Sequence, residues 1–189
     1  INHGLSTGAL FLIVGMIYER RHTRDVDAFG GLWKVMPVYA ALTLIVTLSS
    51  MGLPGLNGFI GEFTILLGAF GSKAIGSPWF AGLAALGVIL AAIYMLWMYQ
   101  RTMTGPTPAS AEGMADLGVR EAGVVAPLLL ALVLFGFYPM PLLNVINPYV
   151  ESTLSQVGVT DEAPLVPATD AGPAAEGTAG QDQVAGGRF

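Results

Sequence analysis

The chain has 189 residues, of which 53% are hydrophobic and only 11% are charged, a balance too apolar for an ordinary soluble domain. The formal charge of −5 arises in residues 151–189, which carry six acids against Arg188, because residues 1–150 carry seven acidic and seven basic residues. Scarce, scattered basic residues exclude a nucleic-acid-binding surface, and the lack of cysteine excludes disulfides, iron–sulfur clusters and thiolate zinc sites in this chain.

The first apolar segment runs from Gly4 to Tyr18. It has about 15 residues, whereas a helix needs about 20 to cross a bilayer. No initiator methionine or signal peptide precedes it. We therefore expect a truncated transmembrane helix at the start of the C-terminal piece of a longer protein.

The second apolar segment, Met36 to Phe70, is too long for one straight span. A continuous helix of this length would reach about 52 Å, against a hydrocarbon core of about 30 Å. Leu53-Pro54-Gly55 lies near its middle, where proline removes a helical hydrogen bond and glycine loosens the backbone. The pattern predicts a broken helix whose freed backbone lies in protein or beside water.

Two further spans follow, at Trp79 to Gln100 and at Glu121 to Tyr138, where Pro139 opposes continuation of the helix. Six of the seven basic residues in residues 1–150 lie in the first and third loops, and Lys73 lies in the second. The positive-inside rule then puts the first and third loops in the cytoplasm and the C-terminal tail outside. The fold class is thus an all-α membrane protein with about four transmembrane helices.

The last part of the chain differs in composition. From Glu151 it is rich in alanine, glycine and proline, with its only aromatic residue at the very end. Such a segment buries too little surface to order itself. We therefore divide the chain into a transmembrane domain, residues 1–148, and a disordered acidic tail, residues 149–189.

Glu62 is the main candidate functional residue, because it is a single carboxylate within the second apolar segment. A charge at membrane depth costs about 2.5–3.5 kcal/mol on insertion scales. Burial disfavours the ionised form, so this side chain is suited to take up and release a proton. The structural alternative is a permanent ion pair, but the apolar segments of this chain offer no lysine or arginine for it.

Other polar groups could join Glu62 in proton transfer. His3 lies at membrane depth in the first segment, and imidazole can pass a proton between its two nitrogens. Tyr39, Thr43, Thr47 and Ser50 share one helix face leading to the break, where their hydroxyls could hold a file of water. The alternatives are packing for His3, and for each hydroxyl a bond back to its own helix.

Several motifs, in this order, resemble those of a known family, the subunit M family of bacterial NADH-quinone oxidoreductase, which is respiratory complex I. The resemblance covers residues 1 to about 148 and rests on His3-Gly-Leu-Ser-Thr-Gly-Ala-Leu, Tyr18-Glu-Arg-Arg-His-Thr-Arg-Asp25, Gly30-Gly-Leu-Trp33, Leu53-Pro-Gly55, Phe59-Ile-Gly-Glu-Phe63 and Gly136-Phe-Tyr-Pro139. The glutamate in Gly61-Glu62-Phe63 favours subunit M over its sister subunits, which tend to have lysine there.

The resemblance implies a fourteen-helix, antiporter-like proton pump of which this chain would be the last four helices. His3 would match a relay residue on the central axis, and Glu62 the terminal proton-exchange site. The implied location is the bacterial cytoplasmic membrane, beside other complex I membrane subunits. The flavin and iron–sulfur clusters would belong to partner subunits, so this chain would hold no redox cofactor. The family's other key groups have no counterpart in this chain, and the acidic tail is atypical.

Two other functions remain open. One is a subunit of a multi-subunit sodium/proton antiporter, or of an energy-converting hydrogenase, with the same fold. The other is a structural membrane anchor in which Glu62 only holds helices together. The proteins that co-purify distinguish the first alternative from complex I. The Glu62→Gln variant distinguishes the second, because a structural anchor would lose assembly or stability while any surviving complex pumped normally.

Overall fold

A computed structural model describes residues 1–72 and 78–158. Its elements in this part of the chain are all helical, as the sequence predicts: α1 (Asn2–Arg21), the 3-10 turn η1 (Val26–Ala28), α2 (Leu32–Val35), α3 (Pro37–Ser50), α4 (Asn57–Gly71), α5 (Pro78–Met103), the 3-10 turn η2 (Ala109–Ala111), α6 (Val119–Phe137) and α7 (Met140–Gln156). Residues 1–146 form one compact unit, and the described residues from Asn147 onward belong to a second.

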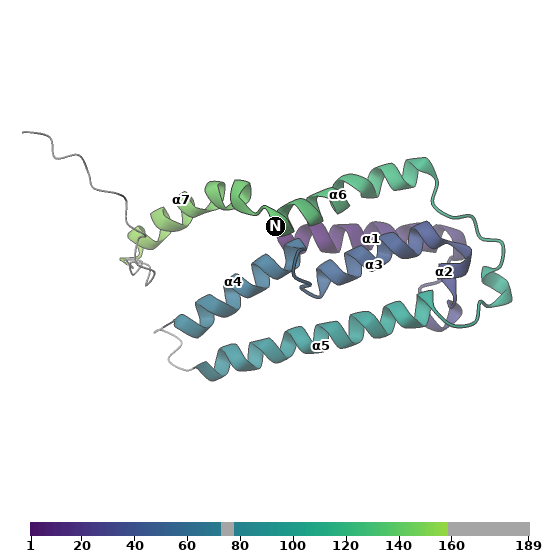
Figure 1. The fold of residues 1–189 in the computed structure, drawn as a ribbon, viewed down its shortest axis with the longest axis horizontal. Helices are drawn as coiled ribbons and strands as arrows, with labels where there is room; N and C mark the ends of the chain where they lie inside the picture. Colours follow the sequence, from purple (N-terminus) through teal and green to yellow (C-terminus); the bar gives the residue numbers. More distant parts are fainter. Residues whose placement is uncertain (73–77, 159–189) are drawn as a thin grey trace, which may run out of the picture. The chain divides into compact units, whose positions relative to one another are not determined.

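In the first unit α1 packs against α3 and α6, while α4 packs against α5 and α6 (Figure 1). The buried face of α1 carries Ala9, Ile13, Met16 and Ile17, whose spacing places them on one side of a helix. They belong to one apolar core with residues of α3, α5 and α6. This core holds α3, and therefore the helix break that follows it, against α1.

The predicted broken helix is confirmed, because α3 ends at Ser50 and α4 begins at Asn57. The intervening backbone lies against protein. A side chain at Gly136 of α6 would collide with the backbone of Gly55 and Leu56, and one at Gly55 would touch the ring of Phe137. The break is thus covered by the last turn of α6, as expected for a freed backbone at membrane depth.

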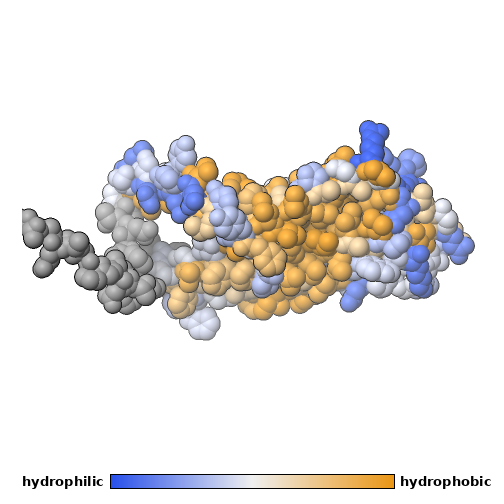
Figure 2. Space-filling model, turned by 45° about the horizontal axis from the view of Figure 1, so that its top comes forward, coloured by the Kyte–Doolittle hydropathy of each residue, from blue (hydrophilic) through white to orange (hydrophobic). Residues whose placement is uncertain are grey.

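Among the described residues, two helices are long and apolar enough to cross a membrane, α5 and α6. Few residues of their apolar windows are buried in the structure, as expected for helices that face lipid or a partner. The broken helix fails this test because α3 and α4 have only 14 and 15 residues. The total of four transmembrane helices therefore stays a prediction. Figure 2 shows an apolar surface along the helices, and hydrophilic residues at the end that holds α2 and the loop after α5.

The structure differs from the sequence prediction in one place. Residues 149–156 were assigned to the disordered tail, but they continue α7. Residues 151–156 contain no alanine, glycine or proline, so the composition that disfavours order begins later than predicted. Pro141 occupies the first turn of α7, where a missing N–H costs little. Residues 157 and 158 of the predicted tail form a turn after α7, and residues 159–189 lie outside the described residues, as does Lys73.

Candidate functional site: a carboxylate beside a helix break

The backbone of the break is held by local hydrogen bonds. The N–H groups of Met51, Gly52 and Leu53 donate to carbonyls in the last turn of α3, at 3.1–3.2 Å. Gly52 and Gly55 have φ angles of 73° and 93°, a conformation that strongly favours glycine. The helix is therefore interrupted here, and α4 continues toward the same end of the unit as α3 (Figure 1).

The side chain of Glu62 extends from α4 toward this break. A side chain at Gly52 would collide with Oε2 of Glu62, so the carboxylate lies against the bare Cα of this glycine. Glu62 is partly buried. Within residues 1–72 and 78–158 its carboxylate has neither a hydrogen bond nor an ion pair, so the described residues do not provide the permanent ion pair of the structural alternative.

A pocket of about 810 Å³ opens beside the carboxylate. Its walls include the start of α1, the end of α3 and the first half of α4. Glu62, His3 and Ser50 all line it. Two predicted proton-carrying groups, more than fifty residues apart in the chain, are thus brought to one pocket. His3 is exposed, and its ring nitrogens lie 3.3 Å from the hydroxyl of Thr7.

The predicted hydroxyl face of α3 divides into two halves. Tyr39 donates its hydroxyl to the carbonyl of Ile13 at 3.1 Å, and Thr43 donates to the carbonyl of Tyr39 at 2.7 Å. The buried hydroxyls of Thr47 and Ser50, nearer the break, have no partner among the described residues. The half near the break therefore has two unengaged hydroxyls, of which that of Ser50 belongs to a residue that lines the pocket, whereas the other half is engaged in packing and helix bonds.

Sequence reasoning missed a second polar group at the break. Asn57, the first residue of α4, is completely buried. Its Oδ1 accepts a hydrogen bond from Ser49 Oγ at 2.6 Å, and its Nδ2 donates to the carbonyl of Asn2 at 3.1 Å. The available signal was an amide inside an apolar run, since a buried polar group needs partners.

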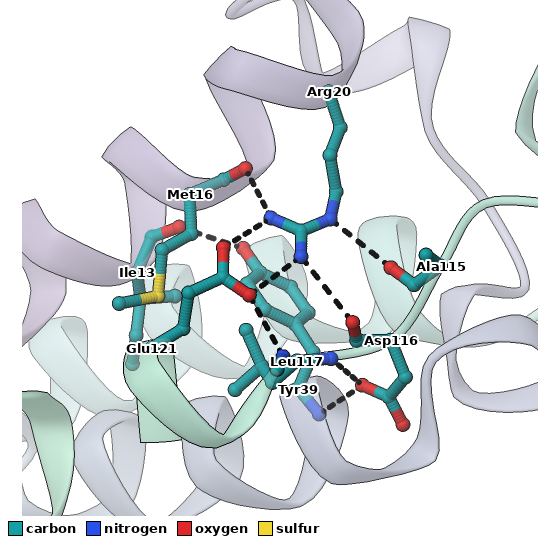
Figure 3. Close-up of polar contacts among 9 residues, drawn as sticks. Ile13, Met16, Arg20, Tyr39, Ala115, Asp116, Leu117 and Glu121 are labelled. Carbon is teal, nitrogen blue, oxygen red and sulfur yellow. Dashed lines mark hydrogen bonds and ion pairs between the residues drawn. The ribbon is translucent and has the colours of Figure 1, made fainter. Parts of the chain in front are cut away.

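The opposite end of the unit holds a charged cluster, which we call the loop-end cluster: Arg20, Asp116 and Glu121 (Figure 3). Arg20 binds both oxygens of Glu121 at 2.7 Å, a bidentate pair that ties α1 to α6. Arg20 also donates to the carbonyls of Met16, Ala115 and Asp116. The carboxylate of Asp116 accepts the N–H groups of Val38 and Tyr39 and so caps α3.

A broken helix with a carboxylate in its second half is what the resemblance to an antiporter-like membrane subunit implies, and comparison with known proteins supports this class. A family model described as NADH:quinone oxidoreductase/Mrp antiporter, transmembrane, matches residues 1–93. The chain belongs to this membrane family and is an integral membrane protein.

Within that family the chain is similar to NADH-quinone oxidoreductase subunit M. The Mycobacterium tuberculosis H37Rv subunit is 46% identical over 181 residues, which cover 94% of this chain and 32% of the relative. The Rhodobacter capsulatus subunit is 43% identical over 151 residues, or 79% and 29% of the two chains.

A solved structure is also similar. A chain of respiratory complex I from Thermus thermophilus with bound NADH matches with a TM-score of 0.75 and 41% identity, over 83% of this chain and 32% of that one. The chain thus spans about a third of the length of these relatives. They are subunits of an enzyme complex, and the match supports the all-helical antiporter-like fold.

Proposed function

We propose that this chain is part of a proton-translocating membrane subunit of an NADH-quinone oxidoreductase. The observation that carries the proposal is the position of Glu62: a carboxylate without a partner among the described residues, beside a helix break, in a pocket that His3 also lines. A permanent salt bridge would favour one charge state, whereas an unpaired acid can change its own. The relatives named as subunit M support the same conclusion.

In this proposal Glu62 exchanges a proton with the pocket, and His3 links the pocket to the interior of the subunit. Thr47 and Ser50 hold water at the break, since their buried hydroxyls lack partners in the described structure. Tyr39 and Thr43 extend this path toward the loop end. Their hydroxyl hydrogens are donated to carbonyls, so their oxygens can only accept a hydrogen bond from water. The driving force is a conformational or electrostatic change that reaches this subunit from its neighbours.

The other membrane subunits and the redox cofactors of the proposed complex would lie in other chains. We propose other complex I membrane subunits and lipid as the partners, with no nucleic acid. Flavin and iron–sulfur clusters, which would carry electrons from NADH to quinone, would belong to partner subunits. The location would be the bacterial cytoplasmic membrane, and the predicted tail would lie outside it, because the basic loops favour the cytoplasm.

The test is Glu62→Gln in the full-length subunit, assembled in its complex. We expect proton translocation per NADH oxidised to fall several-fold, while NADH oxidation by an artificial electron acceptor is retained. Glu112→Gln is the matched control, because Glu112 is an exposed acid in the loop before α6. Full proton translocation in an assembled Glu62→Gln complex would contradict the proposal.

A second candidate function follows from the family description, which also covers Mrp antiporters. A sodium/proton antiporter subunit, or a subunit of an energy-converting hydrogenase, would use the same broken helix and carboxylate. Purification of the intact complex separates these functions. Flavin and iron–sulfur partners that oxidise NADH favour complex I. Partners with hydrogenase activity favour the energy-converting hydrogenase, and the absence of redox partners favours the antiporter.

A further inference from the structure

The second polar group at the break is a junction of three helices. Asn57 belongs to α4, Ser49 to the end of α3, and Asn2 to the start of α1. Ser6 lies in the same junction, with its Oγ 3.2 Å from Ser49 Oγ and 3.4 Å from Asn57 Oδ1. Ser6, Ser49 and Asn57 are each at most 4% exposed. Their polar atoms must therefore satisfy one another within the protein.

Counting the hydrogens shows which of these bonds hold the junction. Ser6 has one hydroxyl hydrogen, which it can donate to the Asn2 carbonyl at 3.2 Å, to Ser49 Oγ at 3.2 Å or to Asn57 Oδ1 at 3.4 Å. The bond from Ser49 to Asn57 and the bond from Asn57 to the Asn2 carbonyl do not compete for a hydrogen. These two bonds form what we call the Asn57 clamp. Both join elements that are separate in the fold.

The helices meet at the clamp with little room to shift. A side chain at Gly58 would collide with the carbonyl of Ser49, and one at Gly61 would come within 3.1 Å of the side chain of Asn2. Both glycines lie in the first half of α4, one helical turn apart. The first half of α4 is therefore pressed against the end of α3 and against α1 at two successive positions.

The clamp lies close to the proton-exchange residue in the chain. Asn57 precedes Glu62 by five residues in the same helix, and Gly52 on the far side of the break touches the Glu62 carboxylate. Two contacts therefore join the two sides of the break: the Ser49–Asn57 hydrogen bond, and the contact between Gly52 and Glu62. A rotation of α4 about its axis would break both.

The geometry points to Asn57 as a positioning residue for proton translocation. Through the Asn57 clamp it fixes the first half of α4 against α3 and α1, so that the Glu62 carboxylate stays beside Gly52 in the pocket that His3 also lines. This inference rests on the proposed function of Glu62. It does not follow from the charge pattern of the sequence, because Asn57 is neutral and takes up no proton itself.

The experiment uses Ser49→Ala and Asn57→Ala in the full-length subunit within its complex. Ser49→Ala removes one hydroxyl and changes little volume, so it is the milder variant. We expect both variants to lower proton translocation per NADH oxidised several-fold and to change its pH profile. Thr102→Val is the matched control: it removes a buried hydroxyl that bonds only to backbone carbonyls of α5, and it should keep the wild-type profile.

The double variants separate this inference from the proposed function. In a Glu62→Gln background, Ser49→Ala should lower proton translocation no further, because the clamp acts through Glu62. Full translocation with Glu62→Gln would overturn the proposed function itself. If Glu62→Gln abolishes translocation but assembled Ser49→Ala and Asn57→Ala complexes keep the wild-type rate and pH profile, only the positioning role is overturned. Failure of Ser49→Ala to assemble, with normal assembly of Thr102→Val, would also overturn it, because the clamp would then serve folding.

Discussion

The two ends of the helical unit treat buried polarity in opposite ways. At the loop end, the charges of Arg20 and Glu121 are paired in a bidentate contact between helices. At the break, the polar groups are neutral apart from Glu62, which has no partner among the described residues. The side chains of Arg20 and Glu121 are only 19% and 25% exposed, so both ends keep their charges partly out of water.

This difference separates stability from function. A paired charge favours one protonation state, and leaving its partner alone is costly, so the loop-end cluster is suited to hold helices together. A carboxylate without a partner is less stable in place but free to gain and lose a proton. The Asn57 clamp holds the first half of α4 in place through neutral hydrogen bonds, so it adds no charge that would pair with Glu62.

The largest effect is expected from breaking the loop-end pair. Arg20→Met leaves Glu121 without its ion-pair partner and removes three bonds to backbone carbonyls. A hydrogen bond from a charged group contributes about 1.5–3 kcal/mol, and several are lost together. We expect much less assembled complex, measured on native gels, with normal proton translocation per NADH in the complex that remains. Adding Glu121→Gln should restore part of the assembly. Loss of translocation in the assembled Arg20→Met complex would remove the distinction between the two ends.

A smaller effect is expected at the glycine beside Glu62. Gly52→Ala forces a left-handed residue, at a cost of about 1–3 kcal/mol, and also displaces the carboxylate. Gly113→Ala is the matched control, because Gly113 has a φ of 77° but open space around it. Thermal unfolding should report the backbone strain in both variants, while only Gly52→Ala should lower proton translocation. Equal translocation in the two variants would mean that the contact between Gly52 and the Glu62 carboxylate is not needed for proton translocation.

The smallest effect on stability is expected along α3, and it tests the two halves of the hydroxyl face. Thr43→Val removes a buried hydrogen bond worth about 0.5–1.5 kcal/mol, whereas the Thr47 hydroxyl has no partner to lose in the described structure. We expect Thr47→Val to slow proton translocation without a loss in melting temperature, and Thr43→Val to lower the melting temperature with a smaller effect on translocation. A slower rate with Thr43→Val alone would place the water path elsewhere.

The sequence allowed prediction of the features that depend on local chemistry. Pro54 and Gly55 within an apolar run indicate the break, and a lone acid such as Glu62 stands out wherever the surroundings are apolar. The structure then adds that His3 lines the same pocket.

Features that join distant parts of the chain could not be predicted. Arg20 and Glu121 lie about a hundred residues apart, and no periodicity within either helix indicates that they pair. The Asn57 clamp depends on three helices meeting, which periodicity within one helix does not encode. The helical residues 149–156 were missed because the composition of the whole tail concealed an ordinary helical stretch at its start.

The most direct test is infrared difference spectroscopy of the full-length subunit in its complex during NADH oxidation. If Glu62 gains and loses a proton, a carboxylic acid band should change in the wild type and be absent from the change in Glu62→Gln. The control Glu112→Gln should keep the band. An unchanged difference spectrum in Glu62→Gln would show that this carboxylate does not change protonation during turnover, and would contradict the account.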